Sequence, residues 1–571
     1  MKSLQLKPLF IIILFWISLS SSAQKIHLKI LGSSEAETQI IDSLSYNNQH
    51  VNLKALFFEI STTSEKLSKK GYIDNQILET VKQNDSSYQC RINLKKQIKN
   101  IYIYIGGQNA FLSSNRKTSD TIIIPYSQLE NYLNQKITEA EKAGYALSKI
   151  KLQNIKKIEN SIFTNLNFSL EEKRNINSIV INYTNPNSKN FFPKGHLKQL
   201  NKKYLNKTFN QEVSKELYND INSFEFVSQS KYPEILFTKD STKIYTYIEK
   251  RKANNFDGYI GFSNDENKKL NLNGYIDISL LNTLKAGEQF SLYWKSDGNQ
   301  QKTFNTKLEI PYIFQTALGI KAQLNIFKQD STFQNTKTAI DLGYYVNYNS
   351  KIYLGYQSTE SSDIQNINSS TISDFDNSYV TSSFEYKKRD YSNILLPQKS
   401  FLNISAGFGK RNSYTDSGST EAVKQFYSQL TAGYNFELNR KNYIYLASQN
   451  YILSSKTYLA NELFRFGGIN SIRGFLENSL QANFTSLILT EYRYLLSSNL
   501  YINSILDYGL YQDVTTSTNP KKIKNLTGLG IGITLNTING ILKINLTNGA
   551  ERTKDLQLYN TIINICYNVK F

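Results

Sequence analysis

Cysteine, histidine and long apolar runs are all scarce in this chain of 571 residues. The two cysteines, Cys90 and Cys566, are far apart in the sequence, which predicts free thiols rather than a disulfide scaffold. The three histidines are scattered and none stands at metal-ligand spacing, so no metal site is expected. The one continuous apolar stretch, residues 9–19, is shorter than the roughly 20 residues of a spanning helix. No helical membrane anchor is therefore expected.

The N-terminus has the order of a secretory signal peptide. Lys2 and Lys7 precede or flank the apolar stretch, no acidic residue interrupts it, and small residues follow up to Ala23. We predict that residues 1–23 are a signal peptide, cleaved after Ala23, and that the chain is exported. Neither cysteine stands at the cleavage site, which argues against a lipoprotein anchor.

The basic excess and the aromatic content both point to a membrane surface. The chain has 66 Lys and Arg against 47 Asp and Glu, and export makes nucleic acid a poor partner for that charge. Tyrosine and phenylalanine number 40 and 31, whereas tryptophan, methionine and proline number 2, 1 and 8. Tyrosine at this level suits the aromatic girdles of membrane β-strands.

The first half of the mature chain repeats one mixed pattern three times, with a period of about 75 residues. Each unit has a strand, a helical stretch and a closing pair of strands, which predicts small α+β modules in tandem. The predicted modules are residues 24–96, 97–173 and 174–252. Helices are expected at residues 53–69, 127–143, 196–205 and 210–221.

The remainder, residues 253–571, alternates between apolar and polar residues with a period of two. Leu542, Ile544 and Leu546, for example, alternate with polar neighbours, so one face of the strand is apolar. Turn signals divide this part into about sixteen strands. Long connections, among them residues 409–422 and 450–481, follow odd-numbered strands, while most others are short. That asymmetry is typical of an outer-membrane barrel, and closure is required because an open edge in lipid leaves backbone groups unpaired.

Three motifs and a terminal aromatic residue stand in order in this second half. They contain Ile472, Arg473, Gly474 and Phe475 in FRFGGINSIRGF, Glu491 and Arg493 in TEYRYLL, Asp507 and Gly509 in ILDYG, and Phe571 at the chain end. Together they resemble the outer-membrane barrel-assembly and translocation family of BamA and TamA type, the bacterial surface antigen family. In that family the first motif is the tip of the sixth loop and the terminal phenylalanine belongs to an assembly signal.

The resemblance implies that the α+β modules are POTRA domains and that a barrel of about sixteen antiparallel strands follows them. Along the thirteenth predicted strand, which contains ILDYG, side chains alternate between the two faces, and this alternation directs Asp507 into the lumen. Arg473 of the folded-back loop is expected to pair with it there. On strand fourteen, Gly528, Gly530 and Gly532 face inward and leave room for the loop backbone.

The resemblance further implies an assembly or translocation factor, most similar to TamA, in the bacterial outer membrane with its modules in the periplasm. Expected partners are unfolded outer-membrane or secreted polypeptides, outer-membrane lipid, and periplasmic or inner-membrane accessory proteins. A two-partner secretion transporter for one exported protein is an alternative, and a passive porin or receptor is an alternative of another class. Single-channel conductance of the purified protein distinguishes the passive porin from the assembly factor and the secretion transporter. No enzymatic activity and no cofactor are expected.

Overall fold

The computed structural model describes residues 25–106, 120–185, 190–264, 270–297, 301–366, 371–391, 393, 395–414, 420–515, 522–551 and 556–571. The predicted signal peptide, residues 1–23, lies outside the described residues. Two compact units divide the chain: Met1–Asn175 with Thr208–Gln211, and Ile176–Lys207 with Glu212–Phe571. No helix in the described ranges is long and apolar enough to cross a membrane.

The first module is a four-stranded sheet packed against two helices. Asn52 begins the longer helix, because its side-chain oxygen accepts a hydrogen bond from the backbone of Ala55 at 2.8 Å. Gly71, with φ of 101°, follows the end of that helix. The sheet has the order β2-β1-β4-β3, with β1 parallel to β4. The elements are β1 (Ile26–Gly32), α2 (Glu35–Asp42), β2 (Gln49–His50), α3 (Leu53–Lys69), β3 (Gln76–Asn84) and β4 (Ser87–Asn93).

The second module has a sheet of order β6-β5-β8-β7 and one α-helix. Apolar residues of β5 and β8, such as Ile103 and Ile162, pack with Ala140 of the helix in a common core. The predicted helix is present, but a short strand, β6, precedes it and was not predicted. The elements are β5 (Asn100–Tyr104), β6 (Thr121–Pro125), the 3-10 turn η1 (Tyr126–Gln128), α4 (Leu129–Lys142), β7 (Lys149–Ile158) and β8 (Ser161–Ser169).

The third module belongs to the same unit as the barrel. Its three-stranded sheet has the order β10-β11-β9, and both predicted helices are present. The elements are β9 (Ile176–Tyr183), α5 (Lys194–Tyr204), α6 (Gln211–Ser223), β10 (Val227–Phe237) and β11 (Thr242–Lys250). The sheets of all three modules fall within the predicted ranges, whose exact bounds stay a prediction.

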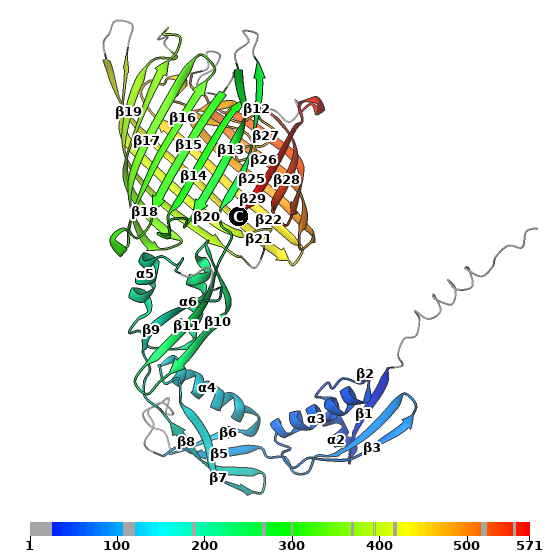
Figure 1. The fold of residues 1–571 in the computed structure, drawn as a ribbon. Helices are drawn as coiled ribbons and strands as arrows, with labels where there is room; N and C mark the ends of the chain where they lie inside the picture. Colours follow the sequence, from blue (N-terminus) through cyan, green and yellow to red (C-terminus); the bar gives the residue numbers. More distant parts are fainter. Residues whose placement is uncertain are drawn as a thin grey trace, which may run out of the picture. The chain divides into compact units, whose positions relative to one another are not determined.

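Sixteen antiparallel strands form a closed barrel (Figure 1), which confirms the predicted fold class. On β17, exposed Ile340 and Leu342 alternate with buried Ala339 and Asp341, so the apolar face points outward to lipid. The strands are β12 (Asn255–Asn264), β13 (Leu270–Leu281), β14 (Gln289–Asp297), β15 (Gln301–Ile310), β16 (Leu318–Gln329), β17 (Phe333–Asn347), β18 (Ser350–Asp363), β19 (Phe375–Arg389), β20 (Gln398–Tyr414), β21 (Thr420–Asn439), β22 (Asn442–Ser454), β25 (Phe484–Ser497), β26 (Leu500–Gln512), β27 (Lys524–Asn536), β28 (Gly540–Ala550) and β29 (Ile562–Lys570).

The two ends of the barrel differ. We call the end where β11 leads into β12 the module end, and the opposite end the loop end. Turns at the module end include residues 440–441 and 498–499, whereas residues 455–483 form the longest connection at the loop end. The prediction of a loop at residues 409–422 was wrong, because β20 and β21 stay paired as far as Tyr414 and Thr420. Continued backbone pairing satisfies groups that a loop leaves to water.

The third module contacts the module end of the barrel through an aromatic box. The ring of His196 on α5 is fully buried, and its centroid lies 5.1 Å from that of Phe224 and 4.7 Å from that of Tyr312. Burial, together with nearby Lys351, lowers the pKa of His196 to about 3. Histidine at this position therefore packs as a neutral ring.

Charged groups add a second contact between the third module and the barrel. The carboxylate of Glu225 pairs with Lys387 at 2.6 Å and with Arg389 at 3.1 Å, both near the end of β19. Burial alone raises the pKa of this carboxyl, but the two cations outweigh it and hold the pKa below its ordinary value. The glutamate therefore remains charged where it is buried.

Candidate functional site

The long connection of residues 455–483, here called the lumen loop, folds against the inner barrel wall. Its short strands β23 (Phe464–Phe466) and β24 (Leu480–Ala482) pair with each other. Ile472 is fully buried in a core cluster with Leu487 of β25 and Leu526 of β27. Apolar burial therefore fixes the tip of the loop beside the strands that carry the other two motifs.

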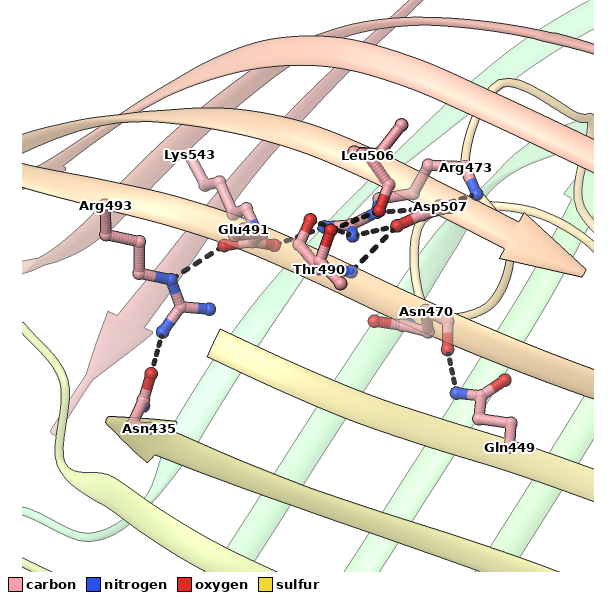
Figure 2. Close-up of polar contacts among 10 residues, drawn as sticks. All are labelled: Asn435, Gln449, Asn470, Arg473, Thr490, Glu491, Arg493, Leu506, Asp507 and Lys543. Atoms are coloured by element: carbon pink, nitrogen blue, oxygen red, sulfur yellow. Dashed lines mark hydrogen bonds and ion pairs between the residues drawn. The ribbon is translucent and has the colours of Figure 1, made fainter. Parts of the chain in front are cut away.

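Arg473 and Asp507 meet at the loop tip, as the sequence predicts (Figure 2). The guanidinium donates from Nε to Oδ2 of Asp507 at 2.7 Å and from Nη2 to Oδ1 at 2.5 Å. The backbone N–H of Arg473 also donates to Oδ2, at 3.0 Å. Asp507 is fully buried and Arg473 is 4% exposed, so this bidentate pair is shielded from water.

Glu491 joins a second arginine to this pair. Its carboxylate accepts from Nη1 of Arg473 and, at 2.7 Å, from Nε of Arg493. Lys543 of β28 lies 3.9 Å away, and Arg493 also donates to Asn435 at 2.9 Å (Figure 2). Two carboxylates thus balance two arginines inside the barrel. Removal of one member of such a buried network costs about 3–5 kcal/mol, because it leaves a charge without its partner.

The register of the strands places the acidic groups. Asp507 on β26 lies opposite Leu489 of β25 and Gly528 of β27. Because side chains alternate along a strand, Glu491 points to the same face as Leu489 and projects beside Asp507. The motifs of β25 and β26 therefore supply one acidic wall to which the arginine of the loop binds.

Two glycines allow the loop backbone to approach that wall. A Cβ on Gly528 would lie 2.2 Å from the carbonyl oxygen of Arg473, and one on Gly474 would lie 2.3 Å from the carbonyl carbon of Asn548. Gly474 also has φ of +90°, which disfavours other residues. Gly530 and Gly532 also face inward, but the loop backbone does not approach them as expected. Their inner sides meet Thr547, Asn545 and Asn503 instead.

The remaining motif residues pack around the pair. Phe475 is partly buried against the core cluster of the loop, and a Cβ on Gly549 would lie 2.7 Å from its ring. Gly509 of β26 is close to Leu487 and Ile472, where a Cβ would lie 2.5 and 3.2 Å from their side chains. These residues therefore pack against one another where the loop tip meets the barrel wall.

Sequence reasoning missed a second anchor of the lumen loop. Glu462, in the 3-10 turn η4 (Ala460–Glu462), pairs with Arg411 of β20, and both side chains are at most 2% exposed. Gln425 of β21 donates to the same carboxylate at 2.9 Å. Arg411 lies within the wrongly predicted loop, where no strand alternation predicts an inward side chain. A strand prediction that continued to Tyr414, where β20 ends, would have placed Arg411 on the inner face.

The closure of the barrel is uneven. Only two residue pairs, Asn255 with Lys570 and Phe256 with Val569, join β12 to β29 among the described residues. In contrast, β12 and β13 share ten pairs, and β28 and β29 share eight. Both pairs of this seam lie at the module end, where the N–H of Phe571 also donates to the carbonyl of Asn254 at 3.0 Å. Among the described residues, the seam therefore has the fewest paired residues of the strand interfaces in the barrel.

No model of a protein family and no curated protein matches this sequence. Among solved structures, it is similar to CdiB from Acinetobacter baumannii, with a TM-score of 0.50 and 12% identity over 96% of this chain and 91% of that one. The chain has the fold of an outer-membrane barrel of the BamA and CdiB type. This confirms the resemblance that its motifs predict.

Two further solved structures belong to the same comparison. CdiB from Escherichia coli gives a TM-score of 0.48 at 11% identity, over 90% of this chain and 98% of that one. BamA from Haemophilus ducreyi lacking POTRA domains 1-3 gives 0.47 at 14% identity, over 82% and 98%.

Proposed function

We propose that this protein inserts or translocates polypeptides at the bacterial outer membrane, as an assembly factor similar to TamA. The proposal rests on the seam. Only two residue pairs join β12 to β29 among the described residues, whereas ten join β12 to β13 and eight join β28 to β29. A parted seam exposes unpaired N–H and C=O groups of β12 and β29. Such an edge templates an incoming strand, which pairs with it by β-augmentation.

The α+β modules are proposed to lie in the periplasm as POTRA domains and to receive clients first. Strand β3 is an edge of its sheet, and nearly all of its residues are exposed. Extended client segments can pair with such an edge before they reach the barrel. No nucleotide hydrolysis is needed, because pairing of client strands and burial of their apolar face in lipid drive insertion. Accessory proteins and outer-membrane lipid are proposed as further partners.

A reconstitution experiment tests the proposal. The full chain, in liposomes of outer-membrane lipid, is mixed with an unfolded outer-membrane barrel, and the rate at which the client becomes protease-resistant is measured. Wild type is expected to raise that rate, whereas a variant with a disulfide across the seam, Phe256→Cys with Val569→Cys in a background without native cysteines, is expected to lose the effect until reduced. An equal rate with and without the protein contradicts the proposal.

Dedicated secretion of one partner is the second candidate, and the likeness to CdiB over nearly the whole chain favours it. Depletion in the native host separates the two roles. Loss of many outer-membrane barrels from the proteome supports general assembly, whereas loss of a single secreted protein supports a dedicated transporter. No change in either contradicts both.

A further inference from the structure

The lumen loop also contacts β14, which lies across the seam from the strands that bind the tip of the loop. The hydroxyl of Tyr293 on β14 donates to Oε1 of Glu477 at 3.1 Å, and Lys295 on the same strand pairs with Oε2. Gly468 of the same loop packs against the backbone of Glu477, since a Cβ on Gly468 would lie 3.0 Å from the Cα of Glu477. The glutamate is therefore held toward β14.

Three residues earlier, the loop touches the other side of the seam. Gly474 lies against Asn548 and Gly549 near the loop end of β28. In the closed order of strands, β28 and β14 are separated by β29, the seam, β12 and β13. The segment from Gly474 to Glu477 therefore crosses the inner face of the seam.

The height of this crossing matters. The two backbone pairs of the seam are at the module end, whereas Asn548 and Lys295 stand toward the loop end of their strands. The loop thus spans the part of the seam where no pair joins β12 and β29 among the described residues. It contacts β28 and β14 at a height where no backbone pair crosses the seam among the described residues.

We propose that residues 474–477 are a strap that holds the loop-end half of the seam closed, and that release of Glu477 from Tyr293 and Lys295 permits opening. Three residues span at most about 11 Å, which is less than the roughly 19 Å of four strand spacings along the wall, so the side chains of Glu477, Tyr293 and Lys295 complete the crossing. Each strand added at the seam lengthens that path by about 4.8 Å. The strap has a fixed length, so an added strand breaks its contact with β14.

The two ends of the strap differ in how readily they release. Asp507 and Arg473 are 0% and 4% exposed, but the side chains of Lys295 and Glu477 are 36% and 33% exposed. Water screens the exposed pair, which makes it the weaker of the two. The contact with β14 therefore opens first, while the loop tip stays on β26 and β28. The role of this release in admitting clients rests on the proposed function, whereas the strap itself does not.

Distance measurement between spin labels tests the strap without any client. Labels are placed on outward positions of β14 and β28, at Leu292→Cys and Leu546→Cys, in full-length protein carrying Cys90→Ser and Cys566→Ser. Glu477→Gln is expected to add a population longer by at least one strand spacing, about 4.8 Å. An unchanged distribution overturns the proposal.

Glu551→Gln is the matched control. Glu551 accepts from Tyr511 at 2.6 Å and pairs with Lys524 at 3.2 Å, so it has the same chemistry, but its partners on β26 and β27 lie on one side of the seam. This variant is expected to leave the distances unchanged, and an equal shift in both variants overturns the proposal. If Glu477→Gln does not fold, Tyr293→Phe is measured with the same labels, and an unchanged distribution there overturns it as well.

A covalent strap links the inference to function. In the background without native cysteines, a disulfide between Lys295→Cys and Glu477→Cys is expected to abolish client insertion until a reductant is added. Full activity of the oxidised variant overturns the strap as a gate. If wild type inserts no client but Glu477→Gln still lengthens the distance, the strap stands and the proposed function fails.

Discussion

Arg473 and Asp507, 34 residues apart in the sequence, form a bidentate pair inside the barrel, with Nε and Oδ2 separated by 2.7 Å. The pair ties a loop that connects two strands to the wall of a third. Since Gly474 and Glu477 follow directly, this pair also fixes one end of the strap that crosses the seam. Stability of the barrel and control of its opening therefore meet in one short segment.

Arg473→Ala and Asp507→Ala are each expected to destabilise the barrel by about 3–5 kcal/mol, because each leaves a buried charge without its partner. Urea unfolding in detergent, followed by tyrosine fluorescence, measures the loss. The double variant is expected to lose less than the sum of the two, and strictly additive losses contradict the pair. Lys524→Ala, which removes an exposed partner of Glu551, serves as the control and is expected to cost at most about 1 kcal/mol.

Gly528→Ala is expected to release the loop tip, because a Cβ there would lie 2.2 Å from the carbonyl oxygen of Arg473. Limited trypsin digestion measures the release as cleavage after Arg473, which wild type is expected to resist because Arg473 is buried. Gly530→Ala is the comparison, since its Cβ would meet Leu546 and Thr547 rather than the loop. It is expected to lower stability without exposing that bond. Equal cleavage in the two variants contradicts the assigned role of Gly528.

Single-channel conductance distinguishes a closed translocation barrel from a passive pore. Wild type in planar bilayers is expected to be mostly closed, since the lumen loop is anchored through both Glu462 and Arg473. Arg473→Ala is expected to show larger and more frequent openings. Stable, equal and large openings in both proteins support the porin alternative.

The docking of the third module is expected to weaken in acid. The pKa of His196 is lowered to about 3 in the folded protein, whereas its ordinary pKa is about 6.5. Between these two pH values the ring binds a proton in the unfolded chain but not in the folded one. The contribution of the neutral ring is complete above pH 6.5 or so and falls by about 1.4 kcal/mol for each pH unit below it.

Thermal unfolding of wild type and His196→Phe, compared between pH 7 and pH 5, measures that effect. The phenylalanine ring keeps the packing against Phe224 and Tyr312 but cannot bind a proton. The variant is therefore expected to depend less on pH than wild type in this window. Identical slopes contradict the role of His196.

Much of the site follows from local pattern. The period of two along residues 253–571 determined the barrel, because a strand between lipid and lumen must alternate its side chains. The same alternation directed Asp507 inward and made Arg473 its expected partner. Glycine on β27 indicated a close backbone approach, although only Gly528 meets the loop.

The tertiary structure alone decided which distant parts meet. Glu477 and Lys295 are 182 residues apart, and no sequence pattern connects them. Arg411 and Glu462 pair only because β20 extends beyond its predicted end. The two residue pairs of the seam likewise depend on how far β12 and β29 overlap once the sheet has closed. Alternation determines the face of each side chain, but closure and stagger of the strands determine its neighbours across the lumen.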